Sequence, residues 1–188
     1  MAIKATVFKA NLQIADMDRY YYADHALTLA QHPSETEERM MVRLLAFALF
    51  ANDALLFAQS ISGEDEPDLW QKDLTGAIEL WIAVGLPDER IMRRACGRAD
   101  RVVIVSYGRA ADIWWNDNKS KLTRLTNLTV LRLPTDETLA LAKLASRTMQ
   151  LQCTIQEGGL MFSCDAGVVQ IEPEIRLGSL SSDKAWQA

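Results

Sequence analysis

The sequence has few of the features that mark secreted, metal-stapled or membrane proteins. Its three cysteines, Cys96, Cys153 and Cys164, are an odd number and form no Cys-x-x-Cys pair, so we predict neither a disulfide framework nor a structural zinc site. No apolar run approaches the roughly 20 residues of a membrane span. The first residues lack the apolar stretch of a secretory signal. We therefore expect a cytoplasmic protein with no membrane partner.

Positive charge is also in deficit. The 188 residues include 20 Lys and Arg against 25 Asp and Glu, so the formal net charge is -5. This balance excludes a polycation that coats nucleic acid through its total charge. Hydrophobic residues make up 49% and charged residues 24%, which excludes a disordered chain. We expect a single domain over residues 1–188, in which about 177–188 form a C-terminal tail.

Hydrophobic periodicity predicts a mixed α/β (α+β) fold with one central mixed sheet flanked by helices. The chain begins with two alternating segments, residues 4–14 and 20–30, which predict a β-hairpin. A helix is expected over about 35–51, with Ser34 as its N-cap and Glu37 three residues on. The remaining expectations are strands at 77–84, 102–107 and 128–133, helices at 88–99, around Trp114-Trp115 and at about 134–146, and a β-meander over 150–172.

Three groups of acidic residues are candidates for chemistry. Asp65, Glu66 and Asp68 form an acidic turn before the 77–84 strand, and carboxylates of this kind bind hard divalent cations such as magnesium. The alternative is a solvated loop. Glu79 lies within an otherwise apolar strand, on the face of Trp81, and is either a buried functional acid or part of an exposed edge. Glu35 and Glu38 begin the long helix, where complementing the helix dipole is a sufficient explanation.

One group of basic residues is a candidate nucleic-acid site. At about 100° per residue, the arginines of the 88–99 helix fall within one arc of roughly 140°. They are Arg90, Arg93, Arg94 and Arg98, and Arg101 follows them. Guanidinium groups bind phosphate oxygens in pairs. The alternative is a solvated face neutralised by Asp88, Glu89 and Asp100.

Several segments, in their order and spacing, resemble the YaeQ family of bacterial proteins, and the resemblance extends over essentially the whole chain. They are His32-Pro33-Ser34-Glu35-Thr36, Glu38-Arg39-Met40-Met41, Asp65-Glu66-Pro67-Asp68-Leu69-Trp70, Leu80-Trp81-Ile82, Gly85-Leu86-Pro87-Asp88-Glu89-Arg90, Ala95-Cys96 and Trp114-Trp115. The resemblance implies a restriction-endonuclease-like fold of the PD-(D/E)xK nucleases. In that fold one metal is held by an Asp, by an acid two residues before a Lys, and often by a Glu of the first helix. Carried over, Pro67-Asp68 matches the leading Pro-Asp and Glu38 matches the helix acid.

The sequence departs from this pattern at two positions. Ala83 stands at the second acid position and Gly85 at the lysine position. Glu79 could replace the acid, and Arg94, Arg93 or Lys72 could replace the lysine. Two hypotheses follow. The first is a nucleic-acid-binding or protein-binding module with a degenerate site. The second is a Mg²⁺-dependent phosphodiesterase or nuclease that uses Asp68, Glu38, Glu79 and Arg94, with the metal on Asp68 and Glu38.

Overall fold

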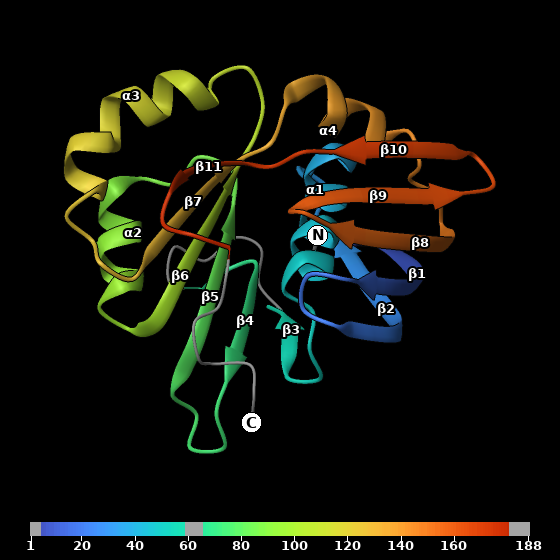
Figure 1. Cartoon of the computed structure of the whole chain (residues 1–188), viewed down its shortest axis with the longest axis horizontal. Helices are drawn as coiled ribbons and strands as arrows, with labels where there is room; N and C mark the ends of the chain where they lie inside the picture. Colours follow the sequence, from blue (N-terminus) through green and yellow to red (C-terminus); the bar gives the residue numbers. More distant parts are fainter. Residues whose placement is uncertain (1–4, 59–65, 181–188) are drawn as a thin grey trace.

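The computed structural model describes residues 5–58 and 66–180, which fold into two β-sheets and four helices (Figure 1). The five-stranded sheet, here called sheet A, has the order β10-β9-β8-β1-β2, and the six-stranded sheet B has the order β11-β7-β6-β5-β4-β3. Both sheets mix parallel and antiparallel neighbours. The mixed α+β class is confirmed, but the expected single central sheet is wrong, because the strands divide between two.

Sheet A begins with the predicted hairpin. β1 (Thr6–Asp16) pairs antiparallel with β2 (Tyr21–Gln31), and β1 also pairs in parallel with β8 (Thr148–Gln156). The predicted meander completes the sheet as β9 (Gly159–Cys164) and β10 (Gly167–Ile171). Alternate β1 residues are buried, as the sequence pattern predicts. The other face of β1 is exposed to solvent.

Sheet B has a parallel centre and antiparallel edges. β5 (Ile78–Val84), β6 (Ala99–Ser106) and β7 (Leu128–Arg132) run parallel. On one side β4 (Leu69–Lys72) pairs with β5, and the two edge strands are β3 (Leu55–Phe57) and β11 (Glu174–Leu177). The sequence of residues 54–60 fits either a short strand or the tail of the preceding helix, and the sequence analysis assigned neither β4 nor β11. Short edge strands carry too few residues for a recognisable alternation.

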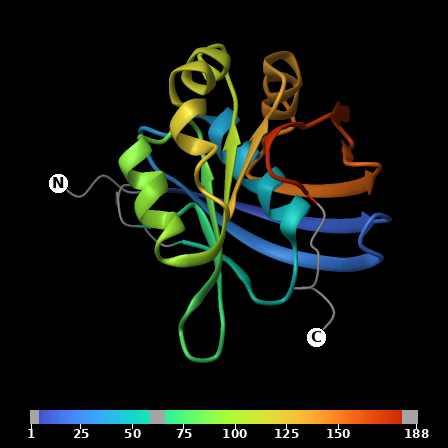
Figure 2. The ribbon, with the colours of Figure 1, turned by 60° about the vertical axis from the view of Figure 1, so that its left-hand side comes forward.

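The long helix α1 (Glu37–Phe50) packs between sheet A and one face of sheet B (Figures 1 and 2). Every residue from Met40 to Phe50 is buried, because sheets lie on two sides of the helix. Its N-cap is Thr36, whose Oγ1 accepts a hydrogen bond from the backbone of Arg39 at 3.1 Å. The prediction of Ser34 as N-cap is therefore wrong, and the Ser34 hydroxyl instead lies 2.7 Å from Nδ1 of His32.

The opposite face of sheet B is covered by α2 (Glu89–Cys96) and α3 (Ala111–Leu122). Met92 and Ala95 of α2 join a second core with Trp81 and Ile104, separate from the core around α1. The remaining helix, α4 (Thr135–Ala142), lies against α1 and β10 (Figure 1). Among the described residues, no helix has both the length and the apolar character needed to cross a bilayer.

Candidate functional site

A cluster of charged side chains lies where the carboxyl ends of the parallel strands meet the start of α1. In open α/β sheets this edge is the usual position of ligand sites. The charge cluster consists of Glu35, Glu38, Arg39, Arg43 and Asp68. Three members, Glu38, Arg39 and Arg43, belong to α1. Glu35 lies just before α1, and Asp68 immediately precedes β4.

Glu35 and Arg43 form the buried base of the cluster. Both side chains are only 2% exposed. Arg43 donates from Nε to Oε1 of Glu35 at 2.7 Å and from Nη2 to Oε2 at 2.8 Å, which is the bidentate geometry that holds a guanidinium and a carboxylate most firmly. Arg43 also donates to the carbonyl oxygen of Ala30 at 3.0 Å, so it ties α1 to β2.

Arg39 links Glu35 to Asp68. Its Nη1 donates to Oε1 of Glu35 at 2.9 Å and its Nη2 donates to Oδ1 of Asp68 at 2.6 Å. Burial alone would lower the pKa of the Arg39 guanidinium. The negative charges of Asp68 and Glu35, with the hydrogen bonds to them, outweigh burial and raise this pKa. Arg39 is therefore fixed as a cation between two carboxylates.

Asp68 has both carboxylate oxygens engaged. Oδ1 accepts the Arg39 bond, and Oδ2 accepts from the backbone N–H of Val84 at 2.7 Å. Val84 is the last residue of β5, so Asp68 also fastens the start of β4 to the end of its neighbour. The side chain is 9% exposed. A metal ion at Asp68 would have to displace Arg39 from it.

Tyr107 follows β6 and lies among the same charges. Burial raises the pKa of its hydroxyl to about 12; Arg39 lowers it, and Glu38, Glu35 and Asp68 raise it. Glu38, Glu35 and Asp68 therefore all lie within electrostatic reach of Tyr107. The Oε1 of Glu38 accepts a hydrogen bond from the Thr138 hydroxyl of α4 at 2.7 Å. The two carboxylates that the sequence analysis expected to hold a metal thus have different hydrogen-bond partners, Thr138 for Glu38 and Arg39 with Val84 for Asp68.

Glu79 and Lys72 lie elsewhere. The β4–β5 register shifts between Gln71 and Lys72, which breaks the alternation that had placed Glu79 on the face of Trp81. The Glu79 carboxylate instead accepts from Nε2 of Gln71 at 2.7 Å, and Gln71 in turn accepts from Asn52, just after α1. Glu79 therefore lies near the end of α1, about five residues along β5 from Val84, or roughly 16 Å. The ammonium of Lys72 lies over the Trp70 ring.

The predicted arginine face is shorter than expected. α2 ends at Cys96, so Arg98 follows the helix and Arg101 lies within β6. Arg98 lies over the ring of Trp81, and Arg101 lies over Phe50 and donates to the Ser179 carbonyl. The expectation of one row through Arg98 and Arg101 is therefore wrong. Arg90, Arg93 and Arg94 remain on the exposed side of α2.

Among the described residues, the charge cluster and the arginines of α2 lie on opposite faces of sheet B. α2 packs on the face of sheet B opposite α1, through the second core. Arg94 is exposed on this helix, whereas Asp68 contacts α1 and the end of β5. The geometry does not bring Arg94 to Asp68 in a lysine-like role. Of the acidic turn, Glu66 is exposed and Asp65 lies outside the described residues.

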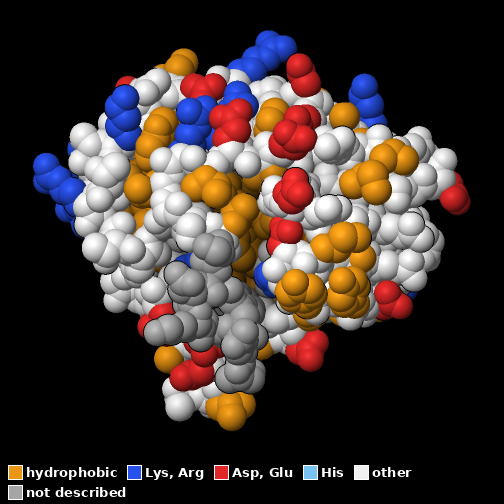
Figure 3. Space-filling view, viewed as in Figure 1, with side chains coloured by type: hydrophobic (Ala, Val, Ile, Leu, Met, Phe, Trp, Pro, Cys, Tyr) orange, Lys and Arg blue, Asp and Glu red, His pale blue; other side chains and the backbone are white. Residues whose placement is uncertain are grey.

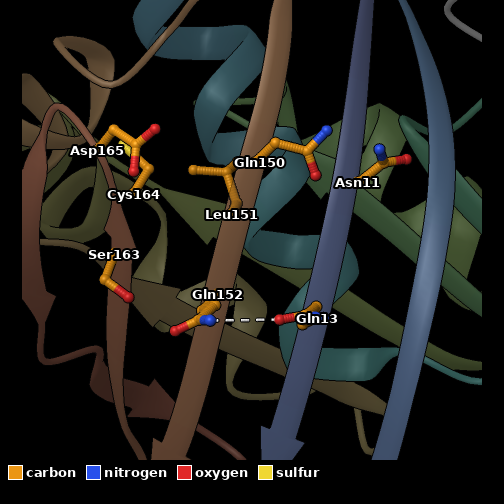
Figure 4. Close-up of a pocket in the computed structure, with 8 residues that line it drawn as sticks. All are labelled: Asn11, Gln13, Gln150, Leu151, Gln152, Ser163, Cys164 and Asp165. Atoms are coloured by element: carbon orange, nitrogen blue, oxygen red, sulfur yellow. Dashed lines mark hydrogen bonds between the residues drawn. The ribbon is translucent and has the colours of Figure 1, made fainter.

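A hollow of about 380 Å³ lies on the outer face of sheet A, away from the charge cluster (Figure 4). Its floor is formed by amide side chains of β1 and β8, with Gln152 donating to Gln13 at 3.3 Å. Ser163, Cys164 and Asp165 lie at its β9 side. Asp165 is the single formally charged side chain among the lining residues. The hollow is therefore better suited to neutral hydrogen-bonding contacts than to catalysis.

The cation that the nuclease resemblance implies does not fit the charge cluster as it stands. A magnesium site needs free carboxylate oxygens at the metal. Those of Asp68 are taken by Arg39 and Val84, and those of Glu35 by Arg39 and Arg43. Oε1 of Glu38 accepts a hydrogen bond from Thr138. Within residues 5–58 and 66–180, no group of three or more His, Cys, Asp or Glu side chains has an arrangement that could hold a metal.

Comparison with known proteins identifies the family. The family profile described as "YaeQ protein" matches residues 1–173. The chain belongs to the YaeQ family. It is 48% identical over 164 residues to the uncharacterized protein YaeQ of Salmonella typhi, covering 87% of this chain and 91% of that one. It is 44% identical over 172 residues to the uncharacterized YaeQ of Escherichia coli strain K12, covering 91% and 95%.

Two solved YaeQ structures share the fold. The crystal structure of YaeQ from Xanthomonas axonopodis pv. citri superposes with a TM-score of 0.91 at 49% identity, covering 94% of this chain and 100% of that one. The crystal structure of YaeQ from Pseudomonas syringae gives 0.90 at 34% identity, covering 94% and 98%. The two-sheet architecture is therefore that of the YaeQ family.

Sequence reasoning missed the two residues that organise the YaeQ charge cluster. Arg39 was quoted only as part of the resemblance, and Tyr107 only as the end of a strand. A signal for Arg39 was available, because Glu35 and Arg39 are four residues apart and share a helical face. No comparable signal pointed to Tyr107, which reaches the cluster through the sheet.

Proposed function

We propose that this YaeQ-family chain is a nucleic-acid-binding module on a restriction-endonuclease-like scaffold, and that it binds without metal-dependent catalysis. The observation that carries the proposal is a basic strip of Arg90, Arg93 and Arg94 on α2, extended by Lys121 of α3. The side chains of Arg93 and Lys121 are 70% and 55% exposed and meet at Glu89. Solvated cations on neighbouring helices can follow a phosphate backbone.

The charges near the basic strip are mixed. On the face shown in Figure 3, basic and acidic side chains are interspersed over the region of α3. The acids adjoining the basic strip, Asp88 and Glu89, offset part of its charge. The strip would therefore bind phosphates with modest, salt-sensitive affinity rather than as a strong polyanion trap.

The test is fluorescence anisotropy of labelled single- and double-stranded DNA and RNA at 50 and 200 mM KCl. We expect affinity to fall with salt, and Arg90→Glu with Arg94→Glu to weaken binding by about tenfold or more, because two phosphate contacts become repulsive. The matched control is Lys9→Glu with Lys143→Glu, which makes the same charge change at exposed positions on β1 and after α4. Equal weakening by both pairs would reject the strip. Absence of binding would reject nucleic acid and leave a protein partner.

A metal-dependent phosphodiesterase is the second candidate. The observation that favours it is the convergence of Glu38, Asp68 and Glu35 around Tyr107. It predicts cleavage of DNA or RNA with Mg²⁺ or Mn²⁺ that Asp68→Asn abolishes. Purified protein that cleaves none of the four substrate types with either metal would exclude this candidate.

A further inference from the structure

The guanidinium of Arg39 lies in an oxygen-rich environment of the kind that hard divalent cations select. Its Nη1 contacts Oε1 of Glu35 at 2.9 Å, and its Nη2 contacts Oδ1 of Asp68 at 2.6 Å and the carbonyl oxygen of Val84 at 3.4 Å. Two carboxylates and a backbone carbonyl are common ligands of such cations. Two carboxylates and one carbonyl are fewer ligands than a complete divalent-cation site has, and an arginine is bound to all three.

We propose that Arg39 is the resident cation of this site and that it keeps the carboxylates from binding a divalent metal. This inference deepens the non-catalytic half of the proposed function, on which it rests, and is independent of nucleic-acid binding by the basic strip. Arg39 stabilises the junction of α1, β4 and β5, which a metal ion would otherwise hold together. The YaeQ charge cluster is then a structural junction built on a metal-like geometry.

The formal charges explain why one arginine is sufficient. Glu35, Glu38 and Asp68 contribute three negative charges and Arg39 and Arg43 two positive ones, which leaves -1. Removal of Arg39 leaves -2, the charge that one divalent cation neutralises. Arg43 does not have the same role, because it is 2% exposed and bound bidentately to Glu35. Arg39 is 24% exposed and lies on the solvent side of the pair.

The experiment measures a gain of binding rather than a loss. Mn²⁺ is titrated by isothermal calorimetry and by electron paramagnetic resonance into wild-type protein and Arg39→Met, which keeps an unbranched apolar stem and removes the charge. We expect the variant to bind about one Mn²⁺ at least tenfold more tightly than the wild type, since Oδ1 of Asp68 is freed and Oε1 of Glu35 keeps only its bond to Arg43. Its unfolding midpoint in urea should rise with added Mn²⁺, while that of the wild type stays constant.

Three further variants test whether the gained Mn²⁺ binding occurs at the site of Arg39. Adding Asp68→Asn to Arg39→Met should abolish the gained Mn²⁺ binding. Arg93→Met, which removes an arginine four residues after Glu89 on α2, should gain none. If Arg39→Met does not fold, Arg39→Gln retains hydrogen-bonding capacity without the charge and takes its place.

Two results overturn the inference. One is saturable Mn²⁺ binding by the wild type as tight as by the variant, and the other is a folded Arg39 variant that gains no binding. Both readouts are made without nucleic acid, so their failure is distinguishable from failure of the basic strip.

Discussion

Two glutamates of this chain have nearly the same local sequence relationship and opposite surroundings. Glu35 pairs with Arg39 four residues on, and with Arg43; Glu89 pairs with Arg93 four residues on, and with Lys121. The Glu35 side chain is 2% exposed and that of Glu89 is 19% exposed. Glu35 lies between the sheets at the start of α1, whereas Glu89 begins α2 on the outer side of sheet B.

The difference shows that burial, rather than the number of partners, determines how much the fold depends on an ion pair. Glu35 and Arg43 are almost completely removed from water, so each depends on its partners. Around Glu89, water and salt compete for the same cations, which remain available to a ligand. One face of sheet B therefore carries buried charges that depend on one another, and the other carries charges that stay in contact with water.

The largest expected effect is on stability at Glu35. Glu35→Gln keeps the shape of the side chain but leaves the buried Arg43 without its counter-charge, so we expect about 3–5 kcal/mol less free energy of unfolding in urea. Glu89→Gln is the matched control and should leave the urea midpoint unchanged. Comparable losses in both variants would remove the distinction between the two pairs.

Asp68→Asn should have an intermediate effect. The amide oxygen can still accept from the N–H of Val84, but the charged bond to Arg39 is lost, so we expect about 1–3 kcal/mol less stability. A double-mutant cycle with Arg39→Met measures the coupling between these two side chains. Strictly additive effects would contradict a direct ion pair.

The smallest effect is the salt dependence of Glu89. A hydrogen bond from Lys121, with the Arg93 charge, lowers the pKa of the Glu89 carboxyl. Because the pKa of Glu89 is lower in the folded state, its ionised carboxylate adds a small stabilisation above the unfolded-state pKa. This stabilisation is lost as the pH falls through the lower, folded-state pKa. Carbon-detected NMR should show the pKa of Glu89 rising toward its ordinary value in 1 M NaCl, where the Debye length is only about 3 Å. A salt-independent pKa would indicate a protected pair.

The elements with strong periodicity were predictable from sequence. Alternation in 4–14 and 20–30 predicted β1 and β2, and apolar spacing predicted α1 to within two residues at each end. The arginine row failed because the helix ends at Cys96, where Gly97 is the C-cap. Glycine directly after a helix is a common stop signal, and the prediction of a helix to Ala99 extended past it. Glu79 failed because the register shift beside it interrupts the alternation.

Within the candidate site, the sequence identified Glu38 and Asp68 as carboxylates but not what neutralises them. Arg39 contacts Asp68 from 29 residues away, and Thr138 contacts Glu38 from 100 residues away.

The sequence by itself determined which segments alternate, which helix is apolar on nearly all sides, and where acids and bases concentrate, because these depend on local periodicity and composition. Only the tertiary structure decided that the strands divide into two sheets, that Arg39 meets Asp68, and that the charge cluster and the basic strip lie on opposite faces of sheet B. Such contacts depend on how distant segments pack, and no local pattern encodes which side of a sheet a helix will cover.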